Sequence, residues 1–304
     1  MQVMTTPIII LHRGNPFYLP YCLYQTRFTN PTAPLILLGD DTNRHYAVAD
    51  HRFIREYGTR ADSFAAVYEH LSSMPYDYEL FCFQRWFILL ELMRRHDFGR
   101  CIHLDSDVLP FTDLAADAAR YPADALAMCH FIPHLTYIGS QDALARFCDY
   151  VTTGYTDPSR LGVLREQFAE FRAGRAPAGF AGVSDMTLFE QYCREDERRI
   201  VNLFYRPDSF IPDDNLNAAS EFVLNRTQTG KQLHWRNGLP YATHAADNRP
   251  VRLKVLHCQG IAKTKMPWLA TFPKAPLGTA YLRDLVRHSL PQYGREAYRH
   301  LRYH

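Results

Sequence analysis

The sequence predicts an α/β protein with a Rossmann-like, mostly parallel central sheet flanked by helices. Short apolar runs rich in β-branched residues recur along the first half of the chain, as expected for buried strands of a parallel sheet. Between them lie segments in which apolar residues have helical spacing. Turn residues such as Gly14 and Gly39 separate the two kinds of segment, so strands and helices alternate.

This alternation is regular in the first half of the chain. Apolar runs predict strands at residues 7–12, 35–38, 101–104, 125–129 and 135–138. Helical spacing predicts helices at residues 17–27, 83–96 and 141–151. Gly99 is a suitable stop for the second helix. The mixed polar and aromatic stretch at residues 40–78 carries no clear element.

The second half is less regular. Residues 152–184, rich in Gly, Pro and Ala around a helix at 163–173, interrupt the alternation, and we predict that they are mobile. Ser184 is placed to cap a helix over residues 185–194. Later strands are expected at residues 200–204, 232–235 and 252–257. We expect a single domain over residues 1–275, followed by a basic helical tail over residues 276–304.

Composition argues against several classes of protein. The 34 Lys and Arg nearly balance the 32 Asp and Glu, so no overall field favours nucleic acid. The seven cysteines lack Cys-x-x-Cys spacing and mostly sit in apolar runs, which indicates reduced thiols and a cytoplasmic location. No segment approaches the roughly 18 apolar residues of a membrane span. The Arg-rich tail either lies on anionic lipid as a peripheral membrane contact or forms an ordinary solvated helix.

Two acidic residues follow the strand predicted at residues 101–104. Ligands of an open parallel sheet bind beyond the carboxyl ends of its strands, where Asp105 and Asp107 lie. Their spacing lets two carboxylates approach one site, and paired carboxylates suit a hard divalent cation that bridges to phosphate oxygens. An isolated Asp-x-Asp is more often an exposed acidic turn. Here apolar residues precede and follow the triplet, so its carboxylates are held between buried segments and need a partner.

A second group of polar residues lies near the other end of the chain. His257 ends a predicted strand, Gly260 follows three residues later, and Lys263 follows three residues after that. A His can complete a metal site, a Gly lets the backbone approach a phosphate, and a Lys supplies positive charge to a leaving diphosphate. Taken alone, the same residues could equally be a core His and a surface Lys.

The Leu-Asp-Ser-Asp-Val-Leu turn and the distant His-x-x-Gly-x-x-Lys together resemble the motifs of the GT-A glycosyltransferases, particularly the glycogenin and lipopolysaccharide galactosyltransferase-like families. The resemblance implies a GT-A type fold, with Mn²⁺ (or Mg²⁺) bound by Asp105, Asp107 and His257. It also implies that Lys263 contacts the diphosphate of a nucleotide sugar, with a UDP-sugar as the expected donor. Two oxygen ligands and one imidazole favour manganese over magnesium.

Other features of the chain are interpreted through the same resemblance. Ser106 and Gly260 are assigned to the donor site. Cys258 departs from the family pattern, which has an aromatic residue there, and Pro267-Trp268 stand later than the Pro-Trp that normally follows the Lys directly. Residues 1–115 would form the nucleotide-sugar-binding half and residues 116–275 the acceptor half. The acceptor would be a saccharide, a lipid-linked saccharide or a protein, bound by loops at residues 152–184 and 206–217.

Basic residues near two expected strands are assigned to the donor. Arg85, expected to begin a helix, would reach the nucleotide sugar with its planar, permanently charged guanidinium. The alternative is a surface Arg, or one paired with Glu91 or Asp97. His12 and Arg13 end the first strand, where such enzymes seat the nucleobase and ribose. A plain strand-to-helix turn has the same composition.

Asp185 is the candidate catalytic residue. It begins a helix that in this fold delivers an acid near the transferred sugar, where it could bind hydroxyls, stabilise an oxocarbenium ion or act as a base. The alternative is an acid of the first helical turn favoured by the helix dipole. The family resemblance leans towards retention of anomeric configuration, whereas a general base at Asp185 would give inversion. Trp235 and Trp268 could stack on sugars or belong to the core.

The sequence therefore predicts a metal-dependent glycosyltransferase that moves a sugar from a nucleotide diphosphate sugar to a hydroxyl group. One alternative is a haloacid dehalogenase-like phosphatase or phosphotransferase, which also carries Asp-x-Asp after an apolar strand. In that class the motif usually lies near the N-terminus and is followed by Thr, whereas Val108 follows it here. The other alternative is a non-catalytic nucleotide-binding scaffold.

Overall fold

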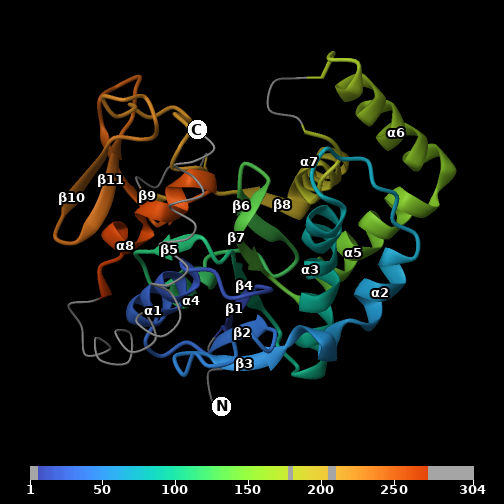
Figure 1. The fold of residues 1–304 in the computed structure, drawn as a ribbon, viewed down its shortest axis with the longest axis horizontal. Coiled ribbons are helices and arrows are strands. Elements are labelled where there is room, and N and C mark those ends of the chain that lie inside the picture. The colour runs from blue at the N-terminus through green and yellow to red at the C-terminus, as the bar shows by residue number, and fades with distance from the viewer. Residues whose placement is uncertain (1–5, 177–180, 205–209, 273–304) are drawn as a thin grey trace.

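The computed structural model describes residues 6–176, 181–204 and 210–272, and a seven-stranded sheet lies at its centre (Figure 1). Its strands are β1 (Ile8–Leu11), β2 (Leu35–Gly39), β3 (Asp50–Phe53), β4 (Cys101–Leu104), β6 (Leu126–Cys129), β7 (Ile132–Ile138) and β8 (Ile200–Asn202). They are arranged in the order β3-β2-β1-β4-β7-β6-β8. Only β7 is antiparallel to its neighbours. The predicted fold class, a mostly parallel sheet flanked by helices, is confirmed.

Both faces of this sheet are buried. Ile8 and Ile10 of β1 belong to the hydrophobic cluster on one face, and Ile9 and Leu11 belong to the cluster on the other. All four side chains are at most 5% exposed. Because successive residues of a strand point to opposite faces, a strand covered on both sides needs apolar residues throughout. This explains why the strands appear in the sequence as continuous apolar runs.

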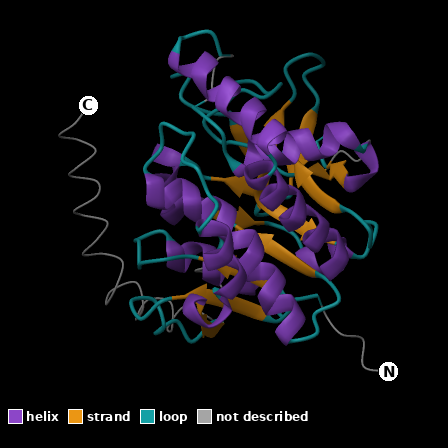
Figure 2. Cartoon of the chain, turned by 90° about the vertical axis from the view of Figure 1, so that its right-hand side faces the viewer, coloured by secondary structure: helices purple, strands orange, loops and turns teal. Residues whose placement is uncertain are grey.

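Helices form the two covering layers, and Figure 2 shows helices lying in front of the strands. One face is covered by α1 (Leu19–Thr29) and α4 (Leu114–Ala118), whose apolar residues join the first cluster. The other face is covered by α2 (Thr59–Ala65), α3 (Tyr76–Arg95), α5 (Gln141–Thr156) and α7 (Asp185–Glu195). Helix α6 (Pro158–Arg172) packs against α5 and contributes Leu164 to the same cluster.

Two smaller sheets lie beside the first cluster. One contains β9 (Phe210–Ile211), β10 (Leu233–Arg236), β11 (Leu239–Thr243) and β12 (Pro250–Leu253) in the order β10-β11-β12-β9. The other pairs β5 (Val108–Pro110) with β13 (Val255–His257). The chain then continues into the 3₁₀ helix η3 (Gly260–Lys265) and α8 (Met266–Leu269). The β5–β13 pair brings the acidic turn next to the C-terminal motif.

Several predicted boundaries were wrong. Helix α3 begins at Tyr76, after Pro75, and not at residue 83. Its first turn contains exposed aromatic and acidic residues, so no helix was predicted there, although acids favour a helix N-terminus. Arg85 therefore lies in the third turn of the helix and not at its start. The strand expected over residues 252–257 is two strands in different sheets, separated at Lys254.

Other elements were missed. The stretch at residues 40–78 contains β3, the 3₁₀ helix η1 (Ile54–Tyr57) and α2. Strands β5 and β11 and helix α4 were also not predicted. The expected interruption after residue 152 is wrong as far as residue 172, because Asp157 caps α6 and Pro158 occupies its first turn.

Part of the chain lies outside the described ranges. Residues 177–180 of the segment predicted to be mobile are among them, as are the tail at 276–304 and residues 205–209. The division near residue 115 and the lipid contact of the tail stay predictions. Within the described ranges, no helix combines the length and the apolar character needed to cross a bilayer.

Candidate functional site

Backbone hydrogen bonds bring the acidic turn and His257 together. The turn at residues 105–107 follows β4 and is closed by a bond from Val108 N to Asp105 O of 3.2 Å. Strand β5 then pairs antiparallel with β13 so that His257 faces Val108. Cys258 N donates to Asp107 O at 2.9 Å. Residues 150 positions apart in sequence thus meet at the carboxyl edge of the central sheet, the usual place for ligands of this architecture.

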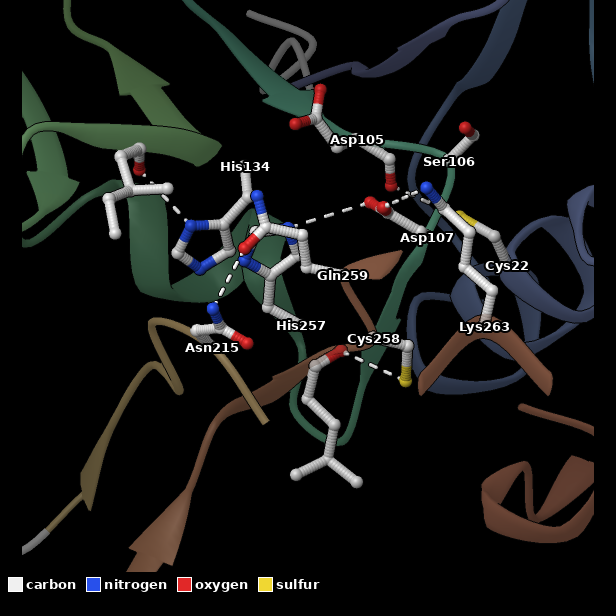
Figure 3. A network of polar contacts seen from close by, with 12 residues as sticks. Cys22, Asp105, Ser106, Asp107, His134, Asn215, His257, Cys258, Gln259 and Lys263 are labelled. Carbon is white, nitrogen blue, oxygen red and sulfur yellow. Dashed lines mark hydrogen bonds and ion pairs between the residues drawn. The ribbon is translucent and has the colours of Figure 1, made fainter. Parts of the chain in front are cut away.

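Three side chains at this point have the arrangement of a cation site. Asp105, Asp107 and His257 each offer one ligand atom, and these atoms lie within 4.8 Å of one another. His257 Nε2 is 3.7 Å from Asp107 Oδ1, and its Nδ1 lies 2.6 Å from Asp214 O (Figure 3). That contact assigns the proton to Nδ1, so the lone pair of Nε2 is available on the Asp107 side. Two carboxylates and one neutral imidazole fit a divalent cation.

Asp105 is held in its ionised form by its neighbours. Its Oδ1 accepts hydrogen bonds from Arg85 Nη1 at 2.9 Å and from His103 Nε2 at 3.1 Å. Burial raises the pKa of this carboxyl, but the Arg85 charge and the His103 hydrogen bond outweigh burial and hold the pKa well below its usual range. Asp105 is therefore a carboxylate throughout the physiological pH range.

Arg85 connects Asp105 with Asp185. Asp185 Oδ2 accepts from Arg85 Nη2 at 2.5 Å and Nε at 3.2 Å, and from Trp86 Nε1 at 3.0 Å. Burial lowers the pKa of Arg85, but the two carboxylates more than reverse this effect. The alternative of a surface Arg, or one paired with Glu91 or Asp97, is wrong, because the Arg85 side chain is only 12% exposed and pairs with Asp105 and Asp185. The Glu91 carboxylate instead accepts from Arg95.

Asp185 is the first residue of α7, and its position is fixed by the chain before it. The side chain of Ser184 caps the helix, as predicted, and Thr187 completes a capping box. Backbone bonds from Ser73 N to Ala181 O and from Val183 N to Leu71 O join this segment to the one that precedes α3. Asp185 is an acid of the first turn, and it also faces Arg85 with only 2% of its surface exposed.

Lys263 and Gly260 lie on the other side of Asp107. Lys263 Nζ is 3.1 Å from Asp107 Oδ2 (Figure 3). Burial lowers the pKa of Lys263, but Asp107 raises it above its ordinary value, so the amine stays charged. Gly260 has φ of +56°, which brings the chain from β13 into η3. A Cβ there would meet no atom within 4 Å, so the left-handed conformation, and not crowding, requires glycine.

The end of β1 adjoins the acidic turn. Ser106 Oγ and His12 Nδ1 are 2.8 Å apart, and burial lowers the pKa of His12 to about 4, so this ring is neutral at physiological pH. Arg13 is exposed and its guanidinium lies 4.0 Å from the centre of the Phe81 ring. Arg13 also borders a cavity of about 350 Å³ beyond β1 and β2, whose walls include Asp40, Phe53, Asp62, Gln84 and Ile88. This cavity therefore adjoins the end of β1 through Arg13.

Four residues of this site were missed in the sequence. His103 could have been found, because it lies two residues before Asp105 and strand geometry places such residues on one face. Trp86 adjoins Arg85. His134 stacks on His257 with ring centres 4.3 Å apart, and Asp214 contacts its Nδ1. These last two contacts depend on the packing of distant segments and leave no local signal.

A buried carboxyl on α3 makes stability depend on pH. Glu79 is 3% exposed and accepts from Ser72 Oγ at 2.8 Å, and burial raises its pKa to about 7. Between the unfolded-state pKa near 4.3 and pH 7, the native state binds more protons than the unfolded state. The free energy of unfolding therefore falls as pH rises through this window. We expect Glu79→Gln to raise the free energy of unfolding by about 1–2 kcal/mol at pH 8 and to leave it unchanged at pH 4.

Urea unfolding at the two pH values measures this effect. Glu166→Gln on the exposed face of α6 is the matched control, and it should change stability at neither pH. A gain for Glu79→Gln of equal size at both pH values would contradict the assignment of Glu79 as the titrating group.

Comparisons with known proteins give structural matches alone. No protein-family model matches the chain, and no curated protein sequence matches it significantly. The matching solved structures include the galactosyltransferase LgtC in complex with donor and acceptor sugar analogs, at 13% identity and a TM-score of 0.42 over 87% of this chain and 95% of that one. An active-site mutant of LgtC matches at 13% identity and a TM-score of 0.39 over the same shares.

Another matched structure is that of a longer chain. The bifunctional glycosyltransferase WbbM matches at 12% identity and a TM-score of 0.40 over 92% of this chain. This chain spans about half of the WbbM chain, 52% of its length. The three matched structures named here are described as glycosyltransferases.

Proposed function

We propose that this protein is a metal-dependent glycosyltransferase that takes its sugar from a nucleotide diphosphate sugar, with a UDP-sugar as the donor. The observation that carries the proposal is the convergence of Asp105, Asp107 and His257, with Lys263 Nζ 3.1 Å from Asp107. A diphosphate leaving group needs positive charge where its own negative charge develops. Three cation ligands and a charged amine at one point of the sheet edge meet that need.

Each group has a distinct task in this proposal. The divalent cation, Mn²⁺ or Mg²⁺, would be held by Asp105, Asp107 and His257 and would stabilise the charge of the departing diphosphate. Lys263 supplies a second positive charge to the same oxygens. The left-handed turn at Gly260 lets the backbone come close to them.

The nucleoside would lie at the end of β1. His12, Arg13 and Ser106 border this region, and the cavity of about 350 Å³ beside Arg13 has a volume in the range of small-ligand pockets. Its walls combine apolar surface with carboxylate, amide and guanidinium groups, which suits a flat base carrying hydrogen-bonding edges. The neutral His12 ring can exchange a hydrogen bond with Ser106 without adding charge beside the phosphates.

The transferred sugar would lie against the Arg85–Asp185 ion pair. Asp185 Oδ2 accepts hydrogen bonds from Arg85 Nε and Nη2 and from Trp86 Nε1. These three bonds do not involve Oδ1, which would be the oxygen that contacts the substrate. A carboxylate held this firmly is suited to accept hydrogen bonds from sugar hydroxyls at one fixed place. The acceptor would be a free saccharide, a lipid-linked saccharide or a protein hydroxyl.

Donor binding with and without metal tests the proposal. With Mn²⁺, a UDP-sugar at about 100 times its dissociation constant should stabilise the fold by about 2.7 kcal/mol. For a chain of 304 residues that corresponds to a rise in Tm of about 4 °C. GDP- and dTDP-sugars serve as matched ligands in a thermal-shift panel, and EDTA should cancel the shift.

Turnover separates the proposal from its alternatives. Donor hydrolysis should be fast with Mn²⁺ and negligible with EDTA, so equal rates under both conditions would contradict a metal-dependent transferase. Hydrolysis of p-nitrophenyl phosphate would indicate the phosphatase alternative. Tight UDP binding without turnover of any sugar donor would indicate a non-catalytic scaffold.

A further inference from the structure

A buried charged cluster lies directly behind His257. Lys231 Nζ is 2.8 Å from Asp213 Oδ1 and donates to Asp214 Oδ1 at 2.8 Å and to Asn215 O at 2.6 Å. The side chains of Lys231 and Asp213 have no exposed surface, and that of Asp214 is 7% exposed. The ammonium thus contacts three oxygens of one short segment, two of them as a hydrogen-bond donor. Lys231 fixes the conformation of residues 213–215.

The segment fixed in this way holds His257 at three points. Asp213 Oδ2 accepts from the backbone N of His257 at 3.0 Å, and Asp214 O accepts from its Nδ1 at 2.6 Å. Leu216 N donates to the backbone O of His257 at 3.0 Å. The first and last bonds set the position of the main chain, and the middle one sets the rotation of the ring. Together they direct Nε2 to Asp107, as Figure 3 shows for the labelled pair.

Burial of this cluster is costly compared with apolar packing. Charges removed from water lose their hydration, and apolar side chains of similar volume often stabilise a fold at least as well as a buried ion pair. One Asp213 oxygen lies next to the ammonium and the other accepts from His257, so the pair links Lys231 to the candidate cation ligand. Geometric control of His257 is a role that apolar substitutes could not fill.

We propose that Lys231 is a positioning residue for the divalent cation: by ordering Asp213 and Asp214 it sets the main chain and the ring of His257. The inference rests on the proposed function, because it assigns His257 to the cation. Lys231 acts through these two residues and does not touch the metal. Groups that orient a metal-binding imidazole in this way typically contribute about 10- to 100-fold to metal affinity.

Lys231→Met removes the ammonium and keeps most of the side-chain volume. We expect the dissociation constant for Mn²⁺ to rise about 10- to 100-fold in the full chain without nucleotide. The electron paramagnetic resonance signal of free Mn²⁺ measures it directly, without any turnover. Asp213→Asn carries the test if Lys231→Met does not fold, and it should weaken Mn²⁺ binding in the same direction.

Lys254→Met is the matched control. Lys254 forms an equally buried ion pair, with Nζ 2.7 Å from Asp117 Oδ2 and side chains 4% and 6% exposed, three residues before His257. Asp117 also accepts hydrogen bonds from the side chains of Arg120, Tyr121 and Tyr137. The control should therefore lose thermal stability as Lys231→Met does, while its Mn²⁺ affinity stays within about twofold of wild type.

The outcomes distinguish a failure of the inference about Lys231 from a failure of the proposed function. Wild-type affinity for Mn²⁺ in a folded Lys231→Met or Asp213→Asn variant overturns the inference and leaves the proposed function intact. The inference is also overturned if Lys254→Met weakens Mn²⁺ binding as much as Lys231→Met does, because the lower affinity would then follow from lower stability of the fold in general. A wild-type chain that binds no Mn²⁺ contradicts the proposed function itself, and the inference falls with it.

Discussion

Asp107→Asn is expected to lower metal-dependent donor turnover by about 10³-fold, the scale seen when one preorganised electrostatic group is removed from a reacting centre. Asp107 stands between its two partners, with Oδ1 3.7 Å from His257 Nε2 and Oδ2 3.1 Å from Lys263 Nζ. Asn keeps the shape of the side chain and removes the negative charge. The cation would lose a charged ligand, and Lys263 would lose the carboxylate that pairs with it.

Two measurements identify the cause of this loss. The kcat/KM for hydrolysis of a UDP-sugar should fall, and the concentration of Mn²⁺ needed for half-maximal rate should rise. Asp142→Asn, an exposed acid in the first turn of α5, is the control and should match wild type in both. Full activity of Asp107→Asn at wild-type Mn²⁺ concentrations would remove Asp107 from the metal site.

The sequence predicts the site well where local chemistry determines it. Strand β4 ends at Leu104 as expected, because a buried parallel strand must be apolar and the next residues are acidic. The cap at Ser184 follows from the preference of hydroxyl side chains for that position. The acidic pair and the distant His257 were connected through the resemblance of their motifs to those of the GT-A glycosyltransferases, although no local rule states that they meet.

Contacts that depend on tertiary packing were not predictable in this way. His257 reaches Asp107 because β5, a strand of three residues, pairs with β13, and so short a strand has too little periodicity to detect. The start of α3 was misplaced because its first three residues, 76–78, are exposed aromatic and acidic side chains. The burial of Lys231 could not be predicted from the sequence, because a lone Lys is normally on the surface. It depends on the position of residues 213–215 in the folded chain.

Arg85→Met is expected to have the largest effect on stability. Arg85 binds Asp105 and Asp185 at once, and its own side chain is 12% exposed. Removing one partner of a buried ion pair leaves an uncompensated charge, which typically costs about 3–5 kcal/mol. Urea unfolding of the free protein at pH 7 measures this loss. Donor turnover should fall as well, because both acids lose the group that orients them.

Three companion variants separate charge from geometry. Arg85→Lys keeps the charge but not the planar fork that reaches two carboxylates, so it should recover only part of the stability. Asp185→Asn in the Arg85→Met background removes one unpaired charge. The double variant should regain about 1–3 kcal/mol of the free energy of unfolding, which measures the coupling between the two residues. Arg95→Met, on the same helix with a side chain 49% exposed, should cost no more than about 0.5 kcal/mol.

The pH dependence of these variants gives an independent check. The pKa of Asp105 is lower in the folded state than in the unfolded state, where it is near 3.9. Its contribution to the free energy of unfolding is therefore present above pH 3.9 and is lost as pH falls through the folded-state pKa. Without Arg85 the folded pKa should rise, so Arg85→Met should unfold at a higher pH than wild type in an acid titration. An unchanged acid transition would show that Arg85 does not hold Asp105 in its ionised form, and the joint role of Arg85 with the two acids would have to be abandoned.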